Sequence, residues 1–143
     1  MSARTSIQDR ILKIRSVKRR MAERHLAQSE IELRNMNELA ERIDLVRQGL
    51  GVTSGVQHGL QLRANSEMIS RLDNAKRSIA APAAAAADNR DHKMELLVAA
   101  RQRETGAEKL ANSAAKQAHL VAEMRENAMR IFRNIAAVEG EQP

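Results

Sequence analysis

The residues able to do acid–base or metal chemistry are few and widely separated in this chain. Its histidines are His25, His58, His92 and His119, and it has no cysteine. Metal ligands on one helix recur three or four positions apart, as in H-E-x-x-H, and no two of these histidines do. His119 and Glu123 have that spacing, but only as a single pair. We therefore expect no catalytic residue, metal site or cofactor, and we predict that the protein is not an enzyme.

The stretch GLGVTSGVQHGL, residues 49–60, contains four of the six glycines. A phosphate-binding loop places its glycines between a strand and a helix or ends in G-K-[ST], and neither feature is present. We interpret residues 49–59 as a hinge between helices. Gly49 or Gly51 is expected to end the first helix in the left-handed conformation that glycine tolerates.

A long helix is expected from about residue 7 to about residue 49. Ser6 and Asp9 have the spacing of an N-terminal capping box. An apolar line starts with Ile7, Ile11 and Ile14, in the alternating steps of four and three typical of a coiled-coil seam. The line continues through Lys18 and Met21. A second line at the same spacing consists of Met36, Leu39, Ile43, Val46 and Leu50.

Helical patterning resumes after the glycines, in a segment at about 60–80 and a helix at about 83–138. Pro82 lies between them and is expected to kink or break the chain, because proline lacks the N–H that a helix interior needs. The later helix has the most regular seam, and half of its positions are alanine. This seam consists of Leu97, Ala100, Glu104, Ala107, Ala111, Ala114, Ala118, Val121, Arg125, Ala128, Phe132 and Ile135.

These patterns predict an all-α fold, a long antiparallel two-helix coiled-coil hairpin that forms one domain over residues 1–143. Charged residues make up 29% of the chain and Phe132 is its one aromatic residue, a composition typical of long helices. Large side chains of the first helix would pack against alanines of the second, with both chain ends near one tip. Because the second half is longer, part of residues 52–90 should fold back, kink or stand uncovered. We expect a monomer.

The positive charge is concentrated near the N-terminus. The formal net charge is +6. Between residues 10 and 24 the only acidic residue is Glu23, against seven basic ones: Arg10, Lys13, Arg15, Lys18, Arg19, Arg20 and Arg24. Such a cluster favours an acidic partner. Nucleic acid is disfavoured, because the isoleucine line runs through the basic run and there are no aromatic residues there for base stacking. A membrane-surface helix is an equally weak alternative.

The chain resembles the FliJ/YscO family, the coiled-coil stalk proteins of flagellar and type III secretion export, and the flagellar branch is favoured. The resemblance rests on the size, on the basic start QDRILKIRSVKRRMAERHLAQSEIEL, on the glycine interruption and on MELLVAARQRETGAEKLANSAAKQ. It covers nearly the whole chain. One departure is the alanine-rich APAAAAAD at residues 81–88, where the family more often has charged residues.

The resemblance implies a non-enzymatic stalk or adaptor in the cytoplasm, peripheral to the inner-membrane export apparatus. Its tip would enter a hexameric export ATPase, and the stalk would also bind the cytoplasmic domain of the export gate and export chaperones. The expected ATPase-ring residues are Arg10, Lys13, Arg15, Lys18, Arg19 and Arg20. The expected gate residues are Leu39, Ile43, Val46, Leu50, Leu72 and Ile79. The alternatives are a self-associating structural coiled coil and, less favoured, a basic nucleic-acid binder.

Overall fold

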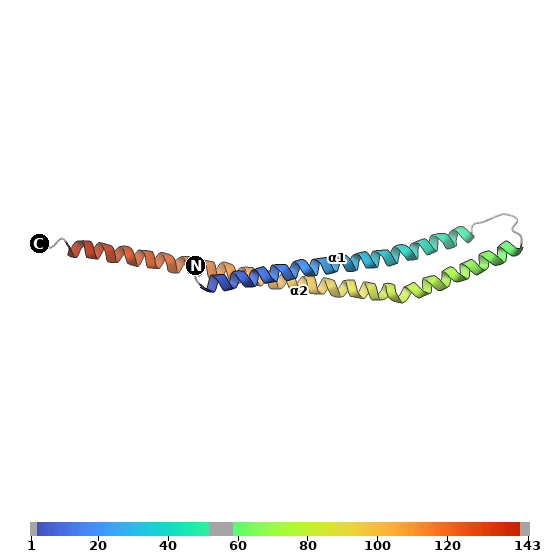
Figure 1. Cartoon of the computed structure of the whole chain (residues 1–143), viewed down its shortest axis with the longest axis horizontal. Coiled ribbons are helices and arrows are strands. Elements are labelled where there is room, and N and C mark those ends of the chain that lie inside the picture. The colour runs from blue at the N-terminus through green and yellow to red at the C-terminus, as the bar shows by residue number, and fades with distance from the viewer. Residues whose placement is uncertain (1–2, 52–58, 141–143) are drawn as a thin grey trace. The chain divides into compact units, whose positions relative to one another are not determined.

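Two long helices form an antiparallel hairpin in the computed structural model, which describes residues 3–51 and 59–140. Helix α1 runs Ala3–Gly51 and helix α2 runs Gly59–Glu139 (Figure 1). The predicted all-α hairpin is therefore confirmed. The expected hinge at 49–59 falls largely on residues 52–58, which lie outside the described residues.

Helix α1 is longer at both ends than the sequence pattern indicated. It begins at Ala3, before the expected cap at Ser6, because alanine and arginine are strong helix formers and neither breaks the turn. It also continues through Gly49 and Gly51. Among the described residues no glycine has a positive φ, so the prediction that Gly49 or Gly51 ends the helix in a left-handed conformation is wrong.

Helix α2 is a single helix with Pro82 inside it, so the expected segments at 60–80 and 83–138 are continuous. Proline cannot donate to the carbonyl of Ser78, whose own hydroxyl donates to the Ala75 carbonyl at 2.7 Å. Figure 1 shows α2 bending in the stretch coloured for residues near 80, with its concave side toward α1. Pro82 is exposed. The proline therefore kinks the helix without ending it.

The spacing of the covered residues changes at the same place. The partly covered residues of α2 around Pro82 include Leu72, Ala75, Ile79, Ala83 and Ala86, with Asp73 and Ala87 next to them. A regular seam alternates steps of three and four, but here two steps of four follow each other, on either side of Ile79. The line of contact thus shifts phase beside the bend.

The chain divides into two compact units, each containing part of both helices. The terminal unit consists of Met1–Arg20 with Ala99–Pro143, and the middle unit of Met21–Val98. In the middle unit Leu26 and Leu97 are buried. Two ion pairs join the helices there: Arg47 with Asp73 at 2.8 Å and Lys76 with Asp44 at 2.6 Å.

In the terminal unit α1 contacts α2 along a different line from the predicted one. Ile7, Ile11 and Ile14 are 55%, 37% and 55% exposed. The partly covered residues of α1 in this unit include Thr5, Gln8, Leu12, Arg15 and Arg19. Three of them directly follow one of the isoleucines in the chain. This line is in phase with the seam through Leu26. The prediction that the isoleucines form the seam is therefore wrong. Only one face of α1 can contact α2, and the contact line through Leu26 determines which face that is.

The alanine line of α2 is covered only as far as Ala118. Ala107 and Ala111 are 5% and 8% exposed, and Ala114 and Ala118 are half-buried. From His119 to Glu139 every residue is exposed. Figure 1 shows this end of α2 continuing beyond the first residues of α1. Excess length of α2 therefore lies at 119–139, because α1 is the shorter helix. Within the described part of 52–90, residues 59–64 are also exposed and the helix kinks at Pro82.

Candidate partner-binding surfaces

One exposed surface of α1 in the terminal unit combines apolar and basic side chains. We call it the basic face. Its apolar members are Ile7, Ile11, Ile14 and Val17, and its basic members are Arg10, Lys13, Lys18 and Arg20. All eight side chains are exposed. The helix places them together because residues three or four positions apart share a side. An acidic surface with apolar patches would match this combination.

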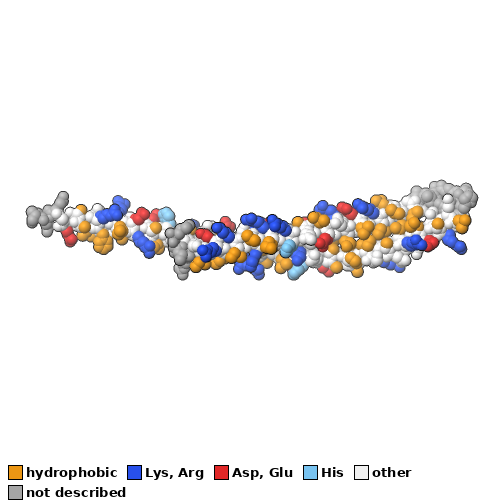
Figure 2. Space-filling model, in the orientation of Figure 1, with side chains coloured by type: hydrophobic (Ala, Val, Ile, Leu, Met, Phe, Trp, Pro, Cys, Tyr) orange, Lys and Arg blue, Asp and Glu red, His pale blue; other side chains and the backbone are white. Residues whose placement is uncertain are grey.

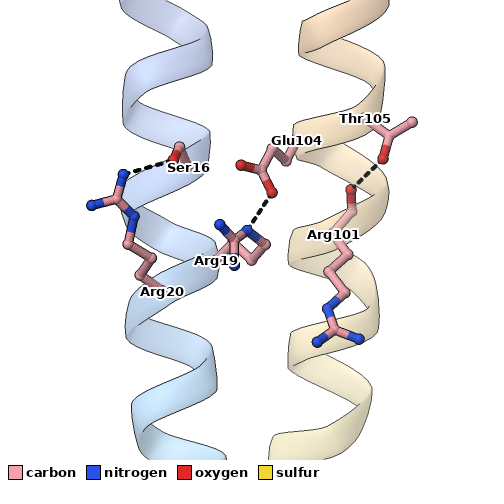
Figure 3. A network of polar contacts seen from close by, with 6 residues as sticks. All are labelled: Ser16, Arg19, Arg20, Arg101, Glu104 and Thr105. Carbon is pink, nitrogen blue, oxygen red and sulfur yellow. Dashed lines mark hydrogen bonds and ion pairs between the residues drawn. The ribbon is translucent and has the colours of Figure 1, made fainter.

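Two of the six expected ATPase-ring residues lie on the other side of the helix. Arg15 and Arg19 are partly covered where α1 faces α2. The Arg19 Nε lies 2.5 Å from an Oε2 oxygen of Glu104, and their side chains are only 27% and 21% exposed. Figure 3 shows this pair between the two helices, beside Arg20, which donates to the Ser16 hydroxyl. Arg10, Lys13, Lys18 and Arg20 remain the accessible members of the set.

The exposed isoleucines also bear on the nucleic-acid alternative. The isoleucine line was expected to be a protein seam within the basic run, which disfavoured nucleic acid. The seam lies instead on the line of Leu12 and Arg15, so it does not occupy the basic run. Nucleic acid stays disfavoured because phosphate contacts need cations and not a row of large apolar side chains.

The expected gate residues divide into two groups within the middle unit. Leu39 and Val46 are 45% and 53% exposed on the outside of α1. The other four are half-buried: Ile43, Leu50, Leu72 and Ile79. Only Leu39 and Val46, one heptad apart on the same side of the helix, are fully presented to a partner.

A third surface is the uncovered end of α2. At seam spacing it carries Val121, Met124, Ala128, Ile131, Ile135 and Val138, which we call the open seam. The five large members are between 42% and 70% exposed. Figure 2 shows hydrophobic side chains gathered on this stretch. Monomeric proteins rarely leave so long an apolar row uncovered.

The open seam also contains a shallow hollow. Its volume is about 440 Å³, and it is lined by Ile131, Asn134, Ile135, Val138 and Glu139. The first four occupy the positions that form the hole for a side chain of a partner helix in a coiled coil. The sequence had indicated part of this line, through Val121 and Ile135, but as contacts already made within the hairpin.

The histidines that could serve as metal ligands or catalytic residues are not grouped together. His119 Nδ1 lies 3.3 Å from Glu123 Oε1, which confirms that the two share a helix side. His25 borders a polar groove of about 270 Å³ in the middle unit, together with Glu32 and Lys93. The buried Ser29 hydroxyl in that groove donates to the Leu26 carbonyl at 2.8 Å. His58 lies outside the described residues.

Neither helix contains a stretch long and apolar enough to cross a membrane, within the ranges that the structure describes. The same ranges contain no group of three or more His, Cys, Asp or Glu side chains arranged to hold a metal ion.

No protein-family model, curated protein or solved structure matches this chain.

Proposed function

We propose that this chain is a non-enzymatic stalk or adaptor of a bacterial type III export apparatus, the flagellar one in the first instance. Its basic face binds the hexameric export ATPase. Leu39 and Val46 contact the cytoplasmic domain of the export gate, and chaperones are further partners. The protein would act in the cytoplasm, at the inner-membrane apparatus.

The observation that carries this proposal is the basic face itself. Four cations and four large apolar side chains are exposed on one side of α1. A protein partner uses both, since charge steers association and apolar burial supplies affinity. Each of the two units presents exposed helix surfaces, which suit an adaptor better than a catalyst.

The test is the affinity of the purified chain for the purified export ATPase of the same bacterium. The double variant Arg10→Glu with Lys13→Glu should weaken binding by at least about tenfold, because two exposed cations of the basic face are reversed. The matched control is Lys109→Glu with Lys116→Glu, which makes the same change in net charge at exposed positions of α2.

Equal loss in both double variants would mean that overall charge, and not the basic face, governs binding. Unchanged affinity in the first variant would remove the basic face from the ATPase contact. Binding to a DNA or RNA duplex that falls log-linearly and steeply with salt, without ATPase binding, would favour the nucleic-acid alternative.

A further inference from the structure

The open seam starts on the line of α2 that α1 covers further up the helix and is then rotated from it. Val121, Ala128 and Ile135 lie on that line, whereas Met124 and Ile131 lie one position before its next members, Arg125 and Phe132. Ala111, Ala114 and Ala118 are the last covered members of that line, and Val121 follows Ala118 at seam spacing. The apolar side therefore does not end where α1 ends. Something with the geometry of a helix would complete it.

The Arg19–Glu104 ion pair fixes where the cover stops. Two antiparallel helices rise equally per residue. Counting back from Arg19 to Thr5, and equally far forward from Glu104, reaches Ala118, which is the last half-buried residue of α2. Because α1 begins at Ala3, the same count to its first residue reaches Leu120. The vacant side of α2 thus begins at Val121.

We propose that a second copy of this chain occupies the open seam, with residues 121–139 of the two copies packed antiparallel. The proposal is independent of the proposed function. The end of the second copy's helix then lies level with the start of α1.

The direction of packing follows from the position of α1. A parallel second copy would bring its own α2, upstream of Val121, onto the side that α1 already covers. An antiparallel copy avoids this collision. The longest antiparallel overlap that leaves α1 in place joins Val121 to Val138, Met124 to Ile135 and Ala128 to Ile131, each pair occurring twice across the two-fold axis.

The side chains agree with this register. The hollow lined by Ile131, Asn134, Ile135 and Val138 would receive Met124 of the second copy, and methionine adapts well to such a hole. Arg125 of one copy would lie beside Phe132 of the other, where a guanidinium can stack on the ring. Asn127 and Asn134 would face each other as neutral amides. Like charges are not brought together along the seam.

Sedimentation equilibrium of the full chain tests the proposal. The mass should rise from 15.9 kDa to twice that value as the concentration increases. The double variant Ile131→Glu with Ile135→Glu should weaken the dimer by at least about a hundredfold, because four carboxylates would enter the seam. Its circular dichroism should stay helical upstream, since both positions are exposed in one chain.

The matched control is Met129→Glu, a change from apolar to acidic at an exposed residue off the seam. It should leave the dimer intact. A chain that is monomeric at every concentration would overturn the proposal. So would a dimer that survives the isoleucine variant, or one that Met129→Glu disrupts as strongly.

Disulfide crosslinking tests the direction, and the absence of native cysteine makes it clean. Val121→Cys and Val138→Cys chains, mixed and oxidised, should give crosslinks between the two different variants. Crosslinks of Val121→Cys chains with each other would overturn the antiparallel arrangement. None of these measurements involves the ATPase, so their failure is distinct from failure of the proposed function.

Discussion

Arg19 and Arg47 each form an ion pair with the opposite helix, but in different surroundings. The Arg19 and Glu104 side chains are 27% and 21% exposed, whereas those of Arg47 and Asp73 are 51% and 33% exposed. Water screens the second pair more strongly, and well-exposed pairs contribute little to stability. The first pair should therefore matter more to the hairpin.

Double-mutant cycles with alanine, followed by urea unfolding, check this difference. We expect a coupling free energy of about 1 kcal/mol between Arg19 and Glu104, and of about 0.3 kcal/mol between Arg47 and Asp73. Equal coupling free energies would show that the lower exposure of the Arg19–Glu104 pair has no effect on its contribution to stability.

Alanine at position 111 is required by space, since its side chain is 8% exposed where α1 lies against α2. Ala111→Leu should lower the free energy of unfolding by about 1–3 kcal/mol, because the larger side chain pushes the helices apart. Ala115→Leu is the control at an exposed position of the same helix and should change stability by less than about 0.5 kcal/mol. Thermal unfolding of both variants measures this, and a neutral Ala111→Leu would contradict the close contact.

At the scale of the helix, Gly106 lies inside α2 with space around it. A Cβ atom there would meet no heavy atom within 4 Å in the described part of the chain. Close approach of a neighbouring helix therefore does not explain this glycine. Glycine in a helix interior costs about 1 kcal/mol relative to alanine.

Gly106→Ala should accordingly raise the free energy of unfolding by roughly 0.5–1 kcal/mol, with no change in helix packing. Chemical denaturation followed by circular dichroism measures it. A loss of stability would mean that the backbone at this position needs glycine for a reason that the static structure does not contain.

The helices themselves could be predicted from the sequence, and much of the site could not. The heptad spacing of α2 located its covered line through Ala107 and Ala118, because burial on one side of a helix imposes that period. The same reasoning failed on α1, where Ile7 and Ile14 are the most apolar line but Gln8 and Arg15 lie on the covered one. The apolar character of a row of side chains on α1 could not show which row contacts the small alanine side chains of α2.

The continuity through Pro82 and the location of the uncovered stretch also escaped prediction. Proline signals a kink or a break equally well, and only the rest of the helix decides between them. The uncovered end at 119–139 depends on where α1 starts relative to α2, which is a matter of register between distant residues. A monomer was expected because the two helices of a hairpin pair within one chain, whereas the open seam leaves part of α2 available to a second one.

Across the whole molecule, separate surfaces are proposed to bind different partners. The basic face of α1 is proposed to bind the ATPase, Leu39 and Val46 the export gate, and the open seam a second copy. Variants of the open seam should leave ATPase binding through the basic face unchanged, since the two surfaces share no residue. A binding titration with Ile131→Glu and Ile135→Glu checks this, and a matching loss of ATPase affinity would show that the two surfaces act together.

The most direct test of the central claim is the hydrolysis rate of the same bacterium's export ATPase, measured with and without this chain at several salt concentrations. The account predicts stimulation at near-stoichiometric amounts, weakening as salt screens the basic face, and lost in the Arg10→Glu, Lys13→Glu variant. An unchanged rate in the presence of the folded, helical chain would contradict the assignment of this protein as the stalk of that ATPase.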